Sequence, residues 1–279
     1  MRASIALSLA IVVSLVACGP APAVAPSSNP APPLSSAPSG LRPREPPVVA
    51  VDVPDALRQV FAASDRSADD RALDEPRRSA EVLAFAGVHD GSRVGEVGAW
   101  QGYTAELLSR AVGASGHVYA EDPQDFDKWI RKSWDERGKR RELMDRVTHL
   151  WRPFEDPFGA DVRGLAAVFS VMFYHDTVWL GVDRPKMNGA IFAALTPGGE
   201  YVVVDHSARA GDATTVTKTL HRIEESVVVG EITQAGFILA ARADFLRHPE
   251  DTRDWNAGDE APPDKRGKSD RFVLRFVRP

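Results

Sequence analysis

Histidine and acidic residues occur together at two points in the second half of the sequence, and this combination can move a proton. Tyr174, His175 and Asp176 follow one long apolar run, and Asp205 and His206 end another. His175 or His206 could accept a proton from a substrate, because an unperturbed imidazole titrates near neutral pH. The alternative is that these residues only satisfy hydrogen bonds at the ends of two strands.

A further histidine, His221, belongs to a stretch, 215–235, that we expect to form one helix. His221 and Glu224 are three residues apart, so a helix would present both side chains on one face. This helix would begin shortly after the second pair of polar residues. The candidate catalytic residues are therefore His175, Asp176, His206 and His221.

A glycine-containing turn in the first half could bind a ligand through its backbone. In the stretch 94–108, VGEVGAWQGYTAELL, the seven residues 96–102 contain one acidic residue, two glycines and one aromatic residue, namely Glu96, Gly98, Gly102 and Trp100. Glycine allows a close approach that a Cβ would block, and the start of a helix presents unpaired N–H groups. The next strand ends in Glu121 and Asp122, where a carboxylate can accept hydrogen bonds from ribose hydroxyls.

The elements that must position these residues alternate along the chain. Strand-like runs end near 98, 121, 151, 175 and 205, and two more follow at 237–245 and 270–277. Helical patterns separate them at 103–112, 126–145, 184–195 and 215–235. This alternation predicts a doubly wound α/β sheet, whose ligands bind beyond the carboxyl ends of the strands.

Other segments of the sequence also carry predictions. Two helices should precede the first strand, and the second, within 74–88, should have Pro76 in its first turn. The charged segment from Asp127 to Arg141 should form a solvated outer face. The segment 248–270 has little apolar content, so it is either a substrate lid or a mobile loop, with Trp255 and Asn256 as the lid candidates.

The beginning of the chain has the pattern of an exported lipoprotein. Residues 1–18 combine a basic start with a short apolar run and end in LVAC, which resembles a bacterial lipobox and implies a lipid on Cys18. The alternatives are an ordinary signal cut elsewhere or a buried strand. Residues 19–50 are rich in Pro, Ala and Ser, which predicts an extended tether, and residues 51–279 should form one domain. Gly19 after the cysteine favours the outer membrane, facing the periplasm.

Composition narrows the class of partner. The 279 residues carry a net charge of −5 without a basic stripe, so we expect no nucleic-acid partner. Cys18 is the only cysteine, which excludes an intramolecular disulfide. Nothing in the sequence indicates the oligomeric state.

The glycine-containing turn resembles motif I of class I S-adenosylmethionine-dependent methyltransferases, an acidic residue followed by x-Gly-x-Gly-x-Gly. Trp100 replaces the middle glycine, as an aromatic residue does in the catechol and caffeoyl-coenzyme A O-methyltransferases. The residues that line up with that branch are Glu96, Val97, Gly98, Trp100, Gly102, Tyr103 and Thr104. The pieces YHD, VVVDHSA, LHRIEE and RDWN…SDRFVLRFV are similar to a bacterial group of predicted methyltransferases of undefined substrate.

The resemblance covers about residues 75–279 and implies a fold and a cofactor. The sheet should have seven strands in the order 3-2-1-4-5-7-6, with the seventh antiparallel. The cofactor should be S-adenosylmethionine, and the partner a small-molecule or envelope acceptor methylated on oxygen or nitrogen. Phe154 could stack on the adenine. The implied cofactor-binding residues are Glu96, Gly98, Trp100, Gly102, Tyr103, Glu121, Asp122, Glu155 and Asp156.

Two questions about this site stay open in the sequence. Trp100 either packs beside the cofactor pocket or fills it. We expect no metal ion, although catechol-type enzymes bind one through residues in places similar to Asp176, Asp205 and His206. A histidine in that set would shift the preference from Mg²⁺ toward softer ions.

Export and cofactor supply are in conflict, which leaves two classes of function. S-adenosylmethionine is made in the cytosol, whereas a lipoprotein is exported. The first class is a methyltransferase, favoured by the two acidic residues at the ribose position and by the His/Asp cluster. The second is a non-catalytic, envelope-anchored binding module on the same fold, favoured by Trp100 and the export signal.

Overall fold

The computed structural model describes residues 45–279. Cys18, the lipobox and nearly all of the expected tether lie outside the described residues. None of the helices in the described part of the chain is both long and apolar enough to cross a membrane.

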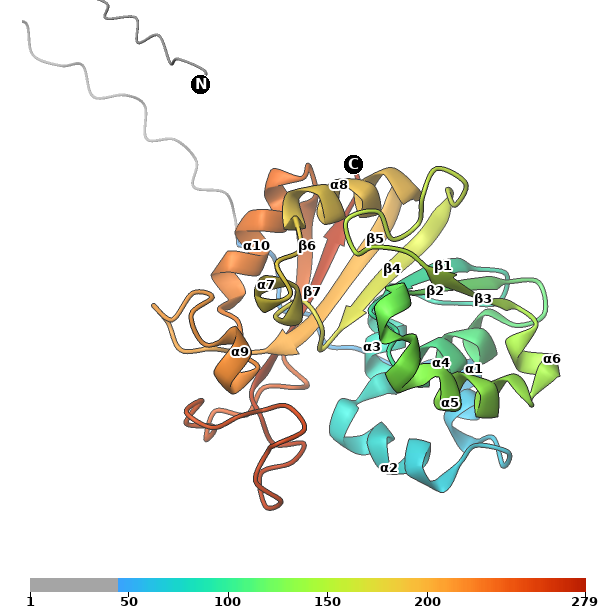
Figure 1. Ribbon diagram of the computed structural model, residues 1–279, viewed down its shortest axis with the longest axis horizontal. Coiled ribbons are helices and arrows are strands. Elements are labelled where there is room, and N and C mark those ends of the chain that lie inside the picture. Colours follow the sequence, from blue (N-terminus) through green and yellow to red (C-terminus); the bar gives the residue numbers. More distant parts are fainter. Residues whose placement is uncertain (1–44) are drawn as a thin grey trace, which may run out of the picture. The chain divides into compact units, whose positions relative to one another are not determined.

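A seven-stranded sheet forms the centre of the domain (Figure 1). Its order is β3-β2-β1-β4-β5-β7-β6, and β7 runs antiparallel to β5 and β6 while the other neighbours are parallel. Both the expected α/β class and the expected strand order are therefore confirmed. The strands are β1 (Arg93–Val97), β2 (His117–Asp122), β3 (Val147–Trp151), β4 (Leu165–Val171), β5 (Leu195–His206), β6 (Ile238–Ala243) and β7 (Arg271–Val277).

Helices cover both faces of this sheet, and each face has its own apolar core (Figure 1). Leu83 of α3 and Leu107 of α4 pack on one face, and Ile191 of α8 and Ile232 of α10 pack on the other. Burying such a side chain contributes about 1.5–3 kcal/mol. The helices are α1 (Asp55–Ala62), α2 (Ala68–Arg77), α3 (Ser79–Phe85), α4 (Tyr103–Val112), α5 (Asp127–Gly138), α6 (Arg141–Met144), α7 (Asp176–Trp179), α8 (Arg184–Ala194), α9 (Thr217–Leu220) and α10 (Glu225–Gln234), with a 3₁₀ turn at Gln124–Phe126.

The strands alternate their side chains between the two cores. In β7, Phe272, Leu274 and Phe276 belong to the core under α8 and α10, while Val273 belongs to the other. This is the period of two that a strand imposes. It explains why a sequence that is apolar at nearly every position forms a strand covered on both sides.

The helix expected to start at Pro76 is placed wrongly by the sequence pattern. Pro76 lies in the last turn of α2, which begins after Ser67, whose hydroxyl accepts a hydrogen bond from the Asp70 N–H. Arg78 then adopts a left-handed conformation (φ 46°), and α3 begins at Ser79. The N-cap of Ser67 was the stronger start signal, and the chain turns two residues after the proline.

The single helix expected over 215–235 is also wrong. The chain forms α9 and α10, and His221 between them is left-handed (φ 50°). Ile223 pairs instead with the end of β5: its N–H donates to the His206 carbonyl, and its carbonyl accepts from the Ala208 N–H. His221 and Glu224 therefore do not share a helical face.

The charged segment 127–141 is not solvated throughout. It forms α5 and the start of α6, and Arg137 in its last turn is buried. Arg137 makes ion pairs with Asp70 and Glu106. This arginine holds α5 against α2 and α4, a role that a count of charges along the segment does not reveal.

Candidate functional site

The glycine-containing turn after β1 is fixed to the end of β2 by backbone hydrogen bonds. The N–H groups of Gly98 and Ala99 both donate to the Glu121 carbonyl at 3.0 Å. Gly98 and Gly102 have φ values of 70° and 76°, which glycine adopts without steric cost. The turn therefore presents its backbone at the carboxyl end of the sheet, where a ligand was expected.

Trp100 lies at the surface of this turn. Its own φ is 51°, an uncommon conformation for a residue with a side chain, and its N–H donates to Asp122 Oδ1 at 2.9 Å. The indole is 42% exposed and packs edge-on against Phe126. Its carbonyl accepts a hydrogen bond from Trp134 Nε1. Trp100 thus packs at the edge of the site, with much of its ring open to solvent.

Two carboxylates beside the turn are buried without full hydrogen bonding. Glu121 is completely buried, and neither of its carboxylate oxygens has a partner among the described residues. Glu96 Oε2 is also buried without a hydrogen-bond partner among the described residues. Burial, reinforced by the charge of Asp122, raises the pKa of Glu121 well above its usual value and that of Glu96 to about 8. Leaving such groups unpaired costs about 1–3 kcal/mol each, which a ligand with hydroxyl groups would offset.

Aromatic side chains pack against the turn at Gly98. A Cβ on Gly98 would lie 2.5 Å from a ring carbon of Phe173, so the ring rests directly on the glycine. Phe154 packs against Phe173, and Phe126 against Phe154, with ring centroids 4.7 and 5.7 Å apart. Only Phe154 of the three was singled out from the sequence. The sequence pattern does not indicate Phe173, because the apolar run 165–175 predicts a single strand.

The strand β4 in fact ends at Val171, four residues earlier than expected. Met172 turns the chain with a left-handed conformation (φ 54°). This turn places Phe173 over Gly98 and leads into α7, with His175 as its N-cap residue.

The other residues assigned to the cofactor point in different directions. The Tyr103 hydroxyl donates to Asp74 and contacts Ser79, on the side of α2 and α3. Asp122 is occupied by Trp100 and by His149. Glu155 accepts a hydrogen bond from the Asp183 N–H. Asp156 is exposed.

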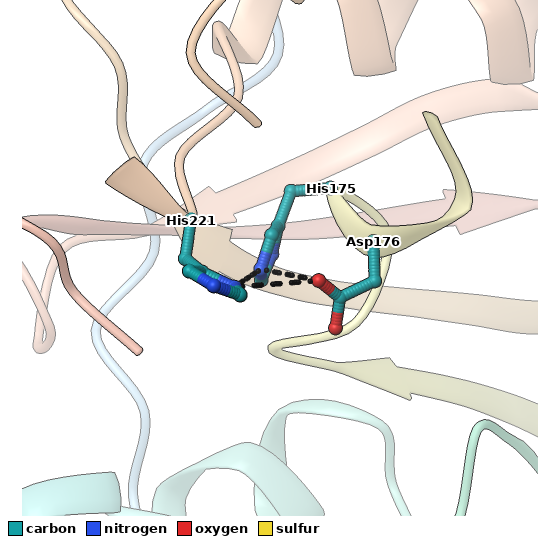
Figure 2. Close-up of side chains that lie close together, drawn as sticks. All are labelled: His175, Asp176 and His221. Carbon is teal, nitrogen blue, oxygen red and sulfur yellow. Dashed lines mark hydrogen bonds and ion pairs between the residues drawn. The ribbon is translucent and has the colours of Figure 1, made fainter. Parts of the chain in front are cut away.

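His175, Asp176 and His221 form one cluster (Figure 2), and Asp205 near the end of β5 contacts it through His175. Asp205, fully buried, accepts hydrogen bonds from both the backbone N–H and Nδ1 of His175, each at 2.7 Å. His175 Nε2 lies 3.1 Å from Asp176 Oδ1 and 3.2 Å from His221 Nδ1. His221 Nδ1 is 3.4 Å from the same oxygen of Asp176.

His206, the fourth catalytic candidate, lies beside this cluster but has its own partner. Its ring centroid is 5.9 Å from that of His175, and its Nδ1 is 2.8 Å from the Ser269 hydroxyl. Burial and the charge of His175 lower its pKa well below the usual value, so His206 is neutral at pH 7.

The pKa values of His175 and Asp176 are shifted in opposite directions within the cluster. Burial acts to lower the pKa of His175, but Asp205 and Asp176 against its ring outweigh burial and raise it to about 10. Burial acts to raise the pKa of Asp176, but its hydrogen bonds to His175 and His221 bring it below the usual range. The cluster therefore attracts positive charge, and without a ligand His175 carries the proton.

The segment 248–270 packs against the cluster at His221 and is held there by contacts with Arg222 and Thr219. Arg222 and Asp251, both with completely buried side chains, form an ion pair at 2.8 Å. Trp255 packs on the Arg222 guanidinium, and the Asn256 amide donates to the Thr219 carbonyl. A Cβ on Gly258 would lie 2.9 Å from the His221 ring, so this segment is packed against that histidine.

The sequence pattern predicts most members of the cluster but not the contacts that assemble it. The positions after β4 and β5 pointed to His175, Asp176, Asp205 and His206. The contact between Asp205 and His175 could be predicted from the sequence, since the strands that carry these residues are neighbours in the expected order. The contact of His221 with His175 could not be predicted, because it depends on the break between α9 and α10.

Comparisons with known proteins show the fold. No protein-family model and no curated protein matches the sequence. An S-adenosylmethionine-dependent methyltransferase from Aquifex aeolicus is similar in structure, with a TM-score of 0.53 and 18% identity over 76% of this chain and 97% of that one.

Two further solved structures are similar to the same extent. The Haloferax volcanii protein in complex with the Trm112 methyltransferase activator has a TM-score of 0.52 and 16% identity, over 82% of this chain and 100% of that one. The [4+2]-cyclase SpnF has a TM-score of 0.52 and 16% identity, over 78% and 85%. The chain thus has a methyltransferase fold, and this fold is also found in a cyclase.

Proposed function

We propose that the protein is an S-adenosylmethionine-dependent methyltransferase that acts on a small-molecule or envelope acceptor, at oxygen or nitrogen. The observation that carries this proposal is Glu121. It is the penultimate residue of β2, beside the glycine-containing turn, and is fully buried with both carboxylate oxygens unpaired among the described residues. Ribose hydroxyls are donors of the kind that this carboxylate lacks.

In this proposal the two halves of the site have separate tasks. S-adenosylmethionine would supply a methyl group on a positively charged sulfur. Glu121 would accept hydrogen bonds from the ribose, the backbone at Gly98 would allow close approach, and Phe154 would stack on the base. The cluster of His175, Asp176 and His221 would hold the acceptor, and the transfer mainly requires that the two partners be aligned.

Calorimetry tests this function directly. The full chain is titrated with S-adenosylmethionine and with S-adenosylhomocysteine, beside the variants Glu121→Ala and Glu142→Ala. Glu142 is exposed and has no assigned part in the site, so it serves as the matched control. We expect wild type and Glu142→Ala to bind equally and Glu121→Ala to lose about 1.5–3 kcal/mol, the usual value for hydrogen bonds to a charged group. Equal binding by all three proteins would contradict the assignment of Glu121.

A second candidate function is a non-catalytic binding module on the same fold. The contact of Phe173 with Gly98 favours it, because this ring lies where a ligand would approach the glycine. The cyclase among the similar structures also shows that this fold serves other chemistry.

Phe173→Ala distinguishes the two candidates. If Phe173 moves aside on binding, wild type binds S-adenosylmethionine and the variant binds it with similar affinity. If Phe173 blocks the site, only the variant binds. The substitution costs about 3–5 kcal/mol of stability, so binding is compared at a temperature where circular dichroism shows both proteins folded.

The location of the protein is part of the proposal. A lipid on Cys18 would anchor the chain in the cell envelope, with the outer membrane as the expected destination and the domain facing the periplasm. The motif that supports this lies outside the described residues.

A further inference from the structure

We propose that His175, Asp176 and His221 form a binding site for one divalent transition-metal ion, with His175 Nε2, Asp176 Oδ1 and His221 Nδ1 as its ligands. They form the one group among the described residues in which three ligand atoms of His, Cys, Asp or Glu lie within 4.8 Å of one another. Figure 2 shows that the two imidazoles and the carboxylate point toward a common centre.

The spacing of the ligand atoms fits a metal ion. The three distances between them are 3.1, 3.2 and 3.4 Å. Three atoms that each lie about 2.1 Å from an ion are about 3.0 Å apart on an octahedral face and about 3.4 Å apart in a tetrahedron. An ion can therefore cap this triangle without a large movement of any side chain.

The surrounding hydrogen bonds orient the ligands as metal sites require. Asp205 accepts from His175 Nδ1, so the lone pair of a neutral His175 lies on Nε2, which faces Asp176 and His221. A carboxylate behind a ligating histidine is the usual second layer of a metal site. Trp179 Nε1 donates to Asp176 Oδ1 and holds that carboxylate in place.

This ligand set differs from the one considered in the sequence. Asp205 holds His175 instead of facing the centre, and His206 binds Ser269. Two imidazole nitrogens and one carboxylate oxygen favour Zn²⁺, Fe²⁺ or Co²⁺ over Mg²⁺ and Ca²⁺, which prefer oxygen ligands.

The ion would keep positions open for a second molecule. The side chains of Asp176 and His221 are 23% and 29% exposed, so one side of the triangle reaches solvent. Three protein ligands with an open position are typical of catalytic ions. The open position would bind an acceptor hydroxyl and favour loss of its proton. This role rests on the proposed methyl transfer, whereas metal binding itself does not.

The test measures metal binding without S-adenosylmethionine. The full chain, freed of metal by chelation, is titrated with Zn²⁺ by calorimetry and with Co²⁺ by visible absorption. We expect one Zn²⁺ per chain in wild type and in His89→Ala, an exposed histidine outside the cluster. His221→Ala and Asp176→Asn should each weaken binding at least 100-fold, and Asp205→Asn by about 10–100-fold.

His221→Cys keeps the test decisive if the other variants are poorly folded. A thiolate in place of the imidazole should retain the ion and add a Co²⁺–thiolate charge-transfer band that wild type lacks. The proposal is overturned if wild type binds no stoichiometric Zn²⁺, if His221→Ala and Asp176→Asn bind as wild type does, or if His221→Cys binds Co²⁺ without the band. Because S-adenosylmethionine is absent, failure of the proposed methyl transfer would not change these results.

Discussion

At the scale of single residues, the most informative feature is a set of carboxyl groups that the protein leaves unsatisfied. Glu96 and Glu121 lie on adjacent strands, both buried, with three of their four carboxylate oxygens unpaired among the described residues. A core made for stability alone would place apolar residues there, since a buried unpaired carboxyl is costly. We therefore expect these two positions to serve ligand binding rather than stability.

Glu96 should make the stability of the unliganded protein depend on pH. Burial and Asp122 raise its folded-state pKa from the usual 4.5 to about 8, so between these values the native state binds more protons than the unfolded state. Stability must then fall as pH rises from about 5 to 8 and level off above 8. In Glu96→Gln this contribution is absent, and its advantage over wild type should grow by up to about 1.4 kcal/mol per pH unit.

Urea unfolding at pH 5, 6.5 and 8 measures this difference, with Glu142→Gln as an exposed control. A constant gap between Glu96→Gln and wild type across the three pH values would show that Glu96 is not protonated in the native state.

At the scale of elements, the sequence predicted whatever depends on local pattern. Strands and helices alternate along the chain, and the expected sheet order is confirmed. The positions of Gly98, Glu121 and Asp205 at strand ends could therefore be inferred. The break in 215–235 could not, because Ile223 leaves the helical pattern to pair with the end of β5, a contact between distant parts of the chain.

The same limit explains what was missed at the site. Phe173 reaches Gly98 because Met172 turns the chain after a strand that is shorter than its apolar run. His221 reaches His175 because α9 stops there. Both contacts depend on where an element ends, and the sequence patterns that suggest helices and strands locate their ends less well than their centres.

The ion pair between Arg222 and Asp251 should be what holds the segment 248–270 in place. Asp251 also accepts hydrogen bonds from the N–H groups of Arg253 and Asp270. Asp251→Ala would leave the buried guanidinium unpaired, so we expect the free energy of unfolding to fall by about 3–5 kcal/mol. Asp254, whose ion pair with Arg209 is exposed, provides the control, and Asp254→Ala should cost at most about 1 kcal/mol.

Urea denaturation compares the two variants. A loss for Asp251→Ala no larger than that for Asp254→Ala would mean that the segment is held by its other contacts.

At the scale of the whole molecule, the fold restricts the chemistry without selecting it. The methyltransferase fold explains why polar groups gather beyond the carboxyl ends of β1, β2, β4 and β5. It does not explain why two imidazoles and two carboxylates meet there, since transfer of a methyl group mainly needs alignment. In the proposed function, the His/Asp cluster would therefore select the acceptor, and the turn at Gly98 would bind the cofactor.

The expected lipidation of Cys18 would place the proposed chemistry outside the cytoplasm. If Cys18 is lipidated, the wild-type protein should sediment with membranes and incorporate a labelled fatty acid, whereas Cys18→Ser should do neither. Ser27→Ala, in the expected tether and outside the LVAC motif, is the matched control and should behave as wild type. Labelling and sedimentation that persist in Cys18→Ser would remove the case for export by this route. The domain would then be in the cytosol, where S-adenosylmethionine is made, and the conflict between export and cofactor supply would disappear. Loss of both signals would instead require either that the cofactor reach the envelope or that the site bind another ligand with ribose-like hydroxyls.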